Sequence, residues 1–524
     1  MKTIKYFFIT VLITFFGLEK VSSQSMSQRI ISFNDTRTIL RNNGFLANNF
    51  GLNAPFYEVP KGGGNHTVYA FSPLWIGKVD DSLVGAAAIY EHNNAFPGPI
   101  ASDYNNAWHE TTRKVFSINK FIIESHQQNW DDPTHVIHDD ILDWPAMGQS
   151  AFNTSQYTAP FVDFNESGVY EPHEGDYPLI VGDQAIFAIY NYDSNAVEND
   201  LNNVNFPLEV QVMVYQFQSQ KEWLDQTTFI HYRVKNKSDK IIKDFQWGSY
   251  VDIDIGFAFD DYFGSDSTRN LVYGYNGPNF DSGWPGTPGY GMNPPAQGIV
   301  LLNKDLFATN KMTYDGTHDI DNLNDLYNSM QGNDSQGSPN TNSQGNEVKF
   351  IYGEPPYVNG SESMYQLGMD DDVQRNVIST YPIDLYPGEV ECYHYGFVYG
   401  RNFSDHILSV EEVINRTDSV QKFFNEEIDL PCDFYNGTMN VNTVKENVFV
   451  NIYPNPSNEI ITFESNSEIE AFQVFSSDGK LILEEQFGLT NKKDVDISSF
   501  NNGVYITVIQ LQNGERVHKR ILKN

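Results

Sequence analysis

Short runs in which apolar and polar residues alternate recur along this chain of 524 residues. Residues 208–215 alternate for part of their length, and residues 228–236, 245–255 and 390–399 have the same character. Successive side chains of a strand point to opposite faces, so a period of two residues predicts half-buried β-strands. We therefore expect a mainly β protein, with a large β-sandwich-like region over most of its length.

Long loops and one helix interrupt this pattern. Residues 276–298 are rich in Gly and Pro, and residues 331–346 are rich in Gln, Asn, Ser and Gly, so both are expected to be long loops. Ser409 and Glu412 have the Ser-x-x-Glu spacing of a capping box, and apolar residues follow at near-helical spacing up to Phe424. This predicts a short C-terminal helix packed on the edge of the β-rich region.

Residues 448–524 have the features of a small, separate β-domain. Residues 468–475 and 480–484 are β-rich, and Asp478-Gly479 between them tolerates the positive φ angles of a tight hairpin. A further strand is expected at residues 503–509. Several short strands at close spacing predict a small β-sandwich.

The order of motifs in this segment carries a family resemblance. Tyr453-Pro454-Asn455-Pro456, then Gly503-Val504-Tyr505, then the basic last residues follow one another as in the type A C-terminal sorting domain of the type IX secretion system of Bacteroidota, which the segment resembles. The resemblance implies an immunoglobulin-like β-sandwich recognised by the type IX secretion machinery. It also implies a protein exported through the periplasm and then secreted or held at the outer cell surface. The alternative is an immunoglobulin-like carbohydrate-binding module of the same shape.

The N-terminal residues have the pattern of a secretory signal. Lys2 and Lys5 precede a short apolar core at residues 6–18, and Val21-Ser22-Ser23 fits a cleavage site for signal peptidase. No later apolar run is long enough to cross a bilayer, so no transmembrane segment is expected in the mature chain. The predicted parts are a signal peptide at residues 1–23, a β-rich cargo region at 24–435, a linker at 436–447 and the sorting domain at 448–524.

Composition limits the expected partners and allows one disulfide. Lys and Arg number 33 against 68 Asp and Glu, a net charge of −35, and such a surface repels phosphate backbones, so nucleic acid is not an expected partner. Aromatic residues make up 14% of the chain and are expected to fill β-sheet cores rather than a carbohydrate-binding face. The two cysteines, Cys392 and Cys432, could form a disulfide in an exported chain or remain two separate buried thiols.

Residues 163–174 form the sharpest local motif. Side-chain oxygens fall at loop positions 1, 3, 5, 9 and 12 with glycine at position 6, which is the spacing of an EF-hand calcium loop. Serine at position 5, Pro172 and strand-like flanks depart from a true EF-hand. The alternative is an acidic surface turn held by Asx-type hydrogen bonds. The candidate calcium ligands are the side chains of Asp163, Asn165, Ser167, Glu171 and Glu174 and the carbonyl of Val169.

Two other groups could bind a cation. Asp252 and Asp254 would share one face of a strand, where close carboxylates repel each other unless they are solvated or bridged by a cation. His135 and His138 could offer metal ligands, although their spacing matches no metalloprotease motif. The acidic group that contains Asp252 and Asp254 also includes three later residues: its members are Asp252, Asp254, Asp260, Asp261 and Asp266.

The cargo region also resembles a family, one of large secreted Bacteroidota proteins of unknown function. Trp144-Pro145-Ala146, Gly175-Asp176-Tyr177-Pro178 and Leu385-Tyr386-Pro387-Gly388-Glu389 belong to blocks of this kind. The resemblance implies a common fold and no assigned activity. No nucleophile elbow, phosphate-cradling loop or dinucleotide fingerprint is present, and no catalytic residue can be singled out. Two hypotheses remain: a calcium-stabilised structural, adhesive or binding protein with a glycan or protein ligand, or a secreted hydrolase acting on polysaccharide or protein.

Overall fold

The chain divides into two compact units, residues 1–438 and residues 439–524. The computed structural model describes residues 27–49, 54–89, 95–193, 206–284, 286–313, 317–370, 373–428, 432, 450–476, 481–512 and 516–524. The predicted signal peptide and the predicted linker at 436–447 lie outside the described residues.

A nine-stranded antiparallel sheet forms the centre of the first unit. Its order is β10-β13-β14-β15-β25-β21-β18-β17, and β9 pairs with β13. The strands are β9 (Phe96–Pro97), β10 (Phe116–Asn119), β13 (Gln184–Asn191), β14 (Leu208–Gln216), β15 (Thr227–Asn236), β17 (Asp261–Asp266), β18 (Leu271–Asn276), β21 (Ala296–Leu301) and β25 (Val390–Gly400). The strands predicted at residues 208–215, 228–236 and 390–399 are thus confirmed.

A second sheet packs on one face of the first. Its order is β22-β23-β16-β7-β8, with β24 paired to β16. Phe71 of one sheet packs edge-on against Tyr395 of the other, and Trp247 stacks on Tyr393 with ring centroids 5.4 Å apart. The expectation that aromatic residues fill the core is confirmed. The strands are β7 (Ala70–Val79), β8 (Ser82–Ala87), β16 (Ile242–Asp252), β22 (Leu306–Met312), β23 (Arg375–Thr380) and β24 (Ile383–Leu385).

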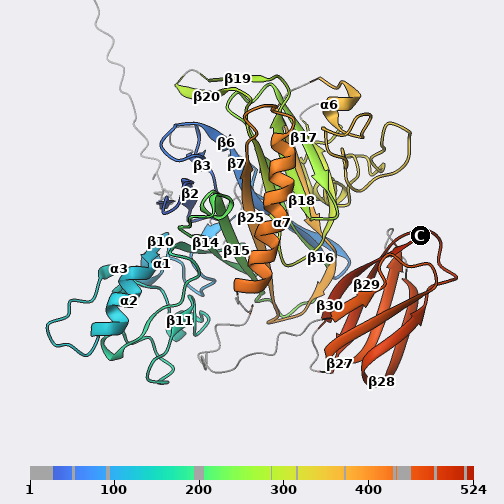
Figure 1. The fold of residues 1–524 in the computed structure, drawn as a ribbon. Helices are drawn as coiled ribbons and strands as arrows, with labels where there is room; N and C mark the ends of the chain where they lie inside the picture. Colours follow the sequence, from blue (N-terminus) through green and yellow to red (C-terminus); the bar gives the residue numbers. More distant parts are fainter. Residues whose placement is uncertain are drawn as a thin grey trace, which may run out of the picture. The chain divides into compact units, whose positions relative to one another are not determined.

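The long helix α7 (Ser409–Glu427) covers the other face of the nine-stranded sheet, where it lies along β25 and β18 (Figure 1). Val410, Val413 and Val420 belong to the same buried cluster as Val300 and Val398 of the sheet. Every residue of β14 is buried because this sheet is covered on both faces. The prediction that residues 208–215 form a half-buried strand is therefore wrong.

The helix begins at Ser409, the residue that was predicted to be its N-cap, and the predicted capping box is absent. Its N-cap is Leu408, and no side chain caps it. Ser409 is buried, and its hydroxyl donates to the Pro294 carbonyl at 3.0 Å and accepts from the Asn402 N–H at 3.0 Å. Tertiary contacts thus occupy the hydroxyl that was expected to cap the helix.

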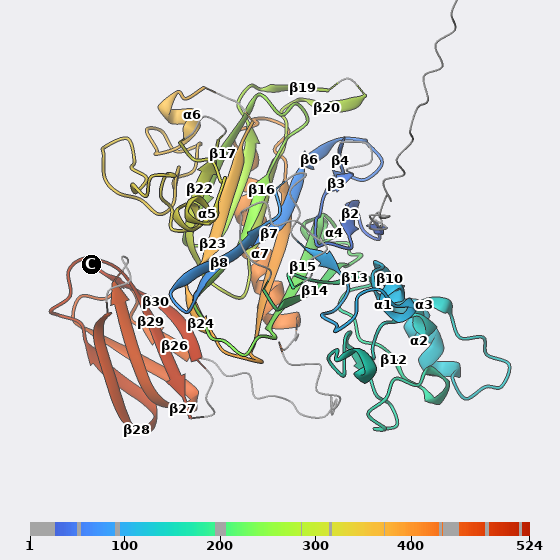
Figure 2. The same cartoon turned by 180° about the vertical axis from the view of Figure 1, so that it is seen from behind.

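Helix α5 (Leu323–Met330) covers the outer face of the six-stranded sheet (Figure 2). Leu326 and Met330 are buried with Leu74, Tyr250 and Val377 of that sheet. The remaining described elements of the first unit are β1 (Gln28–Ile31), β2 (Thr38–Arg41), β3 (Asn48–Asn49), β4 (Ala54–Pro55), β5 (Tyr57–Glu58), β6 (His66–Val68), α4 (Glu222–Asp225), α6 (Met364–Leu367) and those given below.

The segment expected to be a long loop at residues 276–298 contains a hairpin instead. It is formed by β19 (Phe280–Trp284) and β20 (Thr287–Met292), and β21 follows directly. Gly283 has φ +67°, and a Cβ there would lie 2.2 Å from the Gly289 nitrogen. The glycines that suggested a loop are those that let the two hairpin strands approach closely.

A disulfide joins Cys392 of β25 to Cys432, beyond the end of α7. The predicted pairing is confirmed, and the alternative of two separate thiols is wrong. The loop that it closes spans 40 residues and contains α7.

The second unit is a five-stranded antiparallel sheet around its own core. Its order is β26-β27-β29-β30, with β28 paired to β27. β27 and β28 form the predicted hairpin, with Phe475 opposite Leu481, although Asp478-Gly479 lies outside the described residues. Buried side chains include Phe463 and Phe472, which stack with ring centroids 5.0 Å apart. The strands are β26 (Val450–Tyr453), β27 (Ile460–Ser476), β28 (Leu481–Asp496), β29 (Gly503–Leu511) and β30 (Arg516–Lys523).

Candidate functional site

An insertion between β9 and β13 carries the predicted calcium loop and the histidines of the sequence motif. Its elements lie together beside the nine-stranded sheet, in cyan and teal (Figure 1). They are α1 (Ala107–Thr112), β10, α2 (Lys120–Asn129), α3 (Asp139–Leu142), η1 (Ser150–Phe152), β11 (Phe161–Val162), η2 (Pro172–Glu174) and β12 (Tyr177–Pro178).

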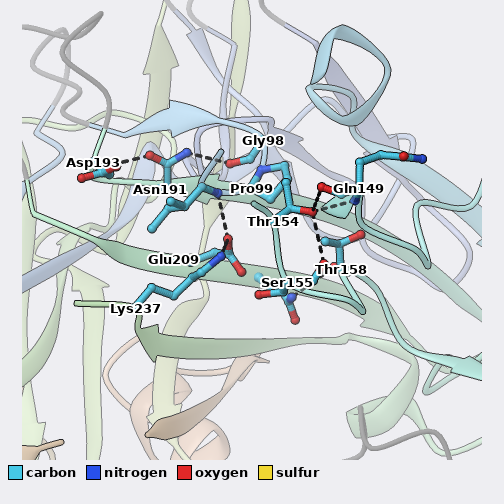
Figure 3. Close-up of polar contacts among 12 residues, drawn as sticks. Gly98, Pro99, Gln149, Thr154, Ser155, Thr158, Asn191, Asp193, Glu209 and Lys237 are labelled. Atoms are coloured by element: carbon cyan, nitrogen blue, oxygen red, sulfur yellow. Dashed lines mark hydrogen bonds and ion pairs between the residues drawn. The ribbon is translucent and has the colours of Figure 1, made fainter. Parts of the chain in front are cut away.

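Buried polar side chains anchor the start of this insertion to the sheet (Figure 3). The Asn191 amide donates to the Gly98 carbonyl at 2.8 Å. Glu209 is buried, accepts from the Ile100 N–H at 2.8 Å and pairs with Lys237 at 3.5 Å. Both side chains come from strands that pair on each side within the nine-stranded sheet, so the insertion starts from a hydrogen-bonded base.

The predicted ligands of the calcium loop gather around Ser167. Its N–H donates to a carboxylate oxygen of Asp163 at 3.0 Å and to the Asn165 amide oxygen at 3.1 Å. Its hydroxyl lies 3.2 Å from the Val169 carbonyl and 2.9 Å from a carboxylate oxygen of Glu171. Five of the six predicted ligands are thus brought together in one turn.

The backbone of the loop turns at its glycine. Gly168 has φ +78°, and its N–H donates to the second carboxylate oxygen of Asp163 at 2.7 Å. Only glycine adopts such a φ without cost, so Gly168 allows the sharp turn that the motif requires at position 6. The loop is closed at its base by β11 and β12, which pair Phe161 with Pro178, so its flanks are strands as expected.

Glu174 lies apart from the other predicted ligands. It is exposed on η2, and its N–H donates to the Glu171 carbonyl at 2.8 Å. Its carboxylate is not among the groups that hydrogen-bond Ser167 in the described residues.

A residue that the motif did not include, Asp176, organises the same loop. It is fully buried and accepts from the Phe164 N–H at 2.8 Å and the Glu171 N–H at 2.7 Å. Burial raises the pKa of Asp176, the two backbone N–H groups lower it, and the charges of Asp163 and Glu171 raise it. Asp176 is thus a third carboxylate at the loop, beside Asp163 and Glu171, and a bound cation would relieve the repulsion among them.

Carboxylates alone do not form a metal cage here. Among the described residues, no three Asp, Glu, His or Cys side chains surround a common metal position. A cation in the loop would depend on the Asn165 amide, the Ser167 hydroxyl and the Val169 carbonyl as well as on Asp163. Such a mixture of oxygen ligands is the type that calcium accepts.

The second acidic group lies mostly inside the protein. Asp252, Asp254 and Asp261 are buried, so they are not solvated surface carboxylates. Asp266, by contrast, pairs with Arg269 at 2.8 Å and takes a structural role. Asp260 is half-buried beside Asp261.

The buried members of this group repel one another. Burial raises the pKa of Asp254 well above the usual carboxyl range, the neighbouring Asp252 raises it further, and Arg375 lowers it. Burial also raises the pKa of Asp261, and the charge of Asp254 adds to this. One oxygen of Asp254 and one of Asp261 have no hydrogen-bond donor among the described residues.

The two histidines of the sequence motif do not act together. His138 is exposed and caps α3, where its ring nitrogen accepts from the Asp140 N–H at 3.1 Å. His135 lies beside His126 of α2, which the sequence motif did not include.

A polar cavity of about 260 Å³ lies next to the loop at residues 331–346. His318 in its wall is held on both ring nitrogens, by Thr317 and Asn340. Glu362 binds Ser343, and Asp334 accepts from the N–H groups of residues 336 and 338. The cavity is smaller than the about 300–1,000 Å³ of ordinary ligand pockets, and its polar groups stabilise the loop.

The five-stranded unit matches a known family. The model of the secretion system C-terminal sorting domain matches residues 451–524, nearly the whole of the second unit. These residues are a type IX sorting domain. The sorting domain marks the chain for export by the type IX secretion machinery, so the protein is secreted or attached to the cell surface. No described helix is long and apolar enough to span a bilayer.

The chain is distantly similar to solved structures, of which two are examples. A polysaccharide lyase is 9% identical with a TM-score of 0.24, and the match covers 64% of this chain and 35% of the lyase. A putative aldose 1-epimerase from Escherichia coli K12 is 9% identical with a TM-score of 0.25, and the match covers 72% of this chain and 100% of the epimerase. These scores are too low to carry over a fold or a function. Among curated proteins, no match to the chain is found.

Proposed function

We propose that the cargo is a calcium-stabilised protein with a structural, adhesive or binding role at or outside the cell surface. The observation that carries the proposal is the convergence of Asp163, Asn165, Val169 and Glu171 on Ser167. These groups supply the mixture of carboxylate, amide, hydroxyl and carbonyl oxygens that binds a hard cation. Cleavage of residues 1–23 by signal peptidase belongs to the same proposal.

The proposal assigns distinct roles to the loop residues. Asp163 and Glu171 supply charge, Asn165, Ser167 and Val169 supply neutral oxygens, and Glu174 turns inward to close the site. Asp176 holds the backbone N–H groups of Phe164 and Glu171 and so keeps the loop curled. Without a cation, the carboxylates repel one another and the loop loosens.

The test is thermal unfolding of the mature chain in calcium and in chelator. Binding to the folded state alone raises stability by about 2.7 kcal/mol at a hundred times the dissociation constant. We expect calcium to raise the melting temperature of the wild type, and Asp163→Ala or Glu174→Ala to reduce that rise. Asp131→Ala, which removes an exposed carboxylate outside the loop, is the matched control and should leave the rise intact.

Two results would contradict the assignment. Identical melting of the wild type in calcium and chelator would make the loop an acidic turn held by its own hydrogen bonds. A rise that survives both loop substitutions would place the cation elsewhere, and the buried group around Asp254 and Asp261 would be tested next.

A further inference from the structure

Two imidazole rings in the insertion face each other at an unusual distance. His126 lies on the buried side of α2, and His135 is half-buried in the turn that precedes α3. The Nδ1 atom of His126 is 3.3 Å from the Nε2 atom of His135, and the ring centroids are 5.5 Å apart. Neither position is part of the calcium loop.

The hydrogen bond made by Nε2 of His126 determines which of its two ring nitrogens carries the proton. Nε2 lies 3.2 Å from the backbone carbonyl of Asp176, which only accepts hydrogen bonds, so Nε2 carries the proton. With the proton on Nε2, the Nδ1 atom that faces His135 carries a lone pair. Metal-binding histidines commonly have this arrangement, in which the second N–H donates to a backbone carbonyl.

The distance between the two facing nitrogens fits two ligands of one metal ion. Two Zn–N bonds of about 2.0–2.1 Å at a tetrahedral angle place the nitrogens roughly 3.3 Å apart. The same separation is long for a direct hydrogen bond from nitrogen.

We propose that His126 Nδ1 and His135 Nε2 bind a zinc-like transition-metal ion, and that His173 is the third ligand. His173 is exposed on η2, so its side chain is free to turn toward the pair. In the described residues no third His, Cys, Asp or Glu already completes the set. The remaining coordination position is open to water. A metal at this place would join α2, the turn before α3 and η2, in addition to the apolar packing of Ile123 against Ile137 and Ile141.

The two proposed sites use different ligands and select different cations, hard oxygen ligands for calcium and imidazoles for zinc, although His173 lies within residues 163–174. The zinc site is tested by calorimetric titration of the mature chain, purified without a histidine tag and stripped with chelator, with zinc chloride. We expect one equivalent of zinc to bind. His135→Gln should weaken binding at least tenfold, and His173→Gln should weaken it measurably. His138→Gln, three residues from His135, is the matched control and should bind as the wild type does.

Cobalt gives a second measurement that does not depend on stability. Bound to the wild type, cobalt should show the intense visible absorption of a tetrahedral site, and the absorption should disappear in His135→Gln. Asp163→Ala should still bind one equivalent of zinc through His126 and His135, which separates this result from the outcome at the calcium loop. Absence of zinc binding to the wild type, or equal binding by His135→Gln, would overturn the proposal and leave a hydrogen-bonded histidine pair.

Discussion

Single carboxylates inside this strongly acidic protein carry different physical roles. Asp176 is satisfied by two backbone N–H groups, whereas Asp254 lies buried beside Asp252 with an oxygen that lacks a donor. The first carboxylate stabilises its loop, and the second is destabilising when charged.

Replacing Asp254 by Asn should therefore stabilise the protein at neutral pH. The pKa of Asp254 is raised in the folded state, so the folded protein holds a proton that the unfolded chain has lost above about pH 4. Stability from this group is fully present below that pH and is lost as pH rises through the raised pKa. Each unit of pKa difference contributes about 1.4 kcal/mol, so a gain on the order of 1 kcal/mol or more is expected at pH 7.

The measurement is urea unfolding of wild type and Asp254→Asn between pH 4 and pH 8, in chelator. The variant should lose less stability over this range than the wild type does. Asp131→Asn makes the same change of charge at an exposed position and should leave the slope unchanged. A loss of stability in Asp254→Asn at pH 7 would show that the ionised carboxylate is favoured where it lies.

The close packing of α7 on the nine-stranded sheet depends on glycines in the strands beneath it. A Cβ on Gly400 of β25 would lie 2.6 Å from the Val413 backbone nitrogen, and one on Gly298 of β21 would lie 2.6 Å from a Val413 methyl group. The helix backbone can approach the sheet this closely only because both side chains are absent.

Gly400→Ala should destabilise the protein by about 1–3 kcal/mol, because the helix must move away from the sheet to make room. Gly353→Ala is the matched control, since its nearest contact would be an ordinary 3.5 Å, and it should change stability by less than about 0.5 kcal/mol. Denaturant unfolding of the two variants and the wild type measures the change in the free energy of unfolding. Equal effects would mean that α7 is loosely packed.

The elements themselves were largely predictable, because periodicity is a local signal. β14, β15 and β25 follow the two-residue pattern, and α7 follows helical spacing from Ser409 onward. Burial was not predictable, because β14 looks half-buried until the layers on both of its faces are known.

The candidate sites were predictable only in part. The spacing of residues 163–174 predicts a turn in which five of the six oxygen groups lie together, because these residues are close in sequence. Asp176 reaches the loop through the pairing of β11 with β12, and His126 meets His135 through the packing of α2. Neither contact is encoded in any single motif.

For the molecule as a whole, export should depend on the sorting domain. Deleting residues 448–524 is expected to trap the cargo in the periplasm, while cleavage of the signal peptide continues. Fractionation and protease digestion of intact cells measure the location. Equal surface exposure of the truncated and full-length proteins would contradict the role of the domain, whereas export of a reporter fused to residues 448–524 would support it independently.

The disulfide also determines how the cargo would bear mechanical load. If the protein is held at the cell surface through its C-terminal end, tension enters the cargo at Cys432. The covalent link passes this tension directly to Cys392, near the start of β25 in the nine-stranded sheet. The chain between the two cysteines, which includes all of α7, then carries no force. Under tension, the nine-stranded sheet would therefore have to unfold before α7 could detach from it.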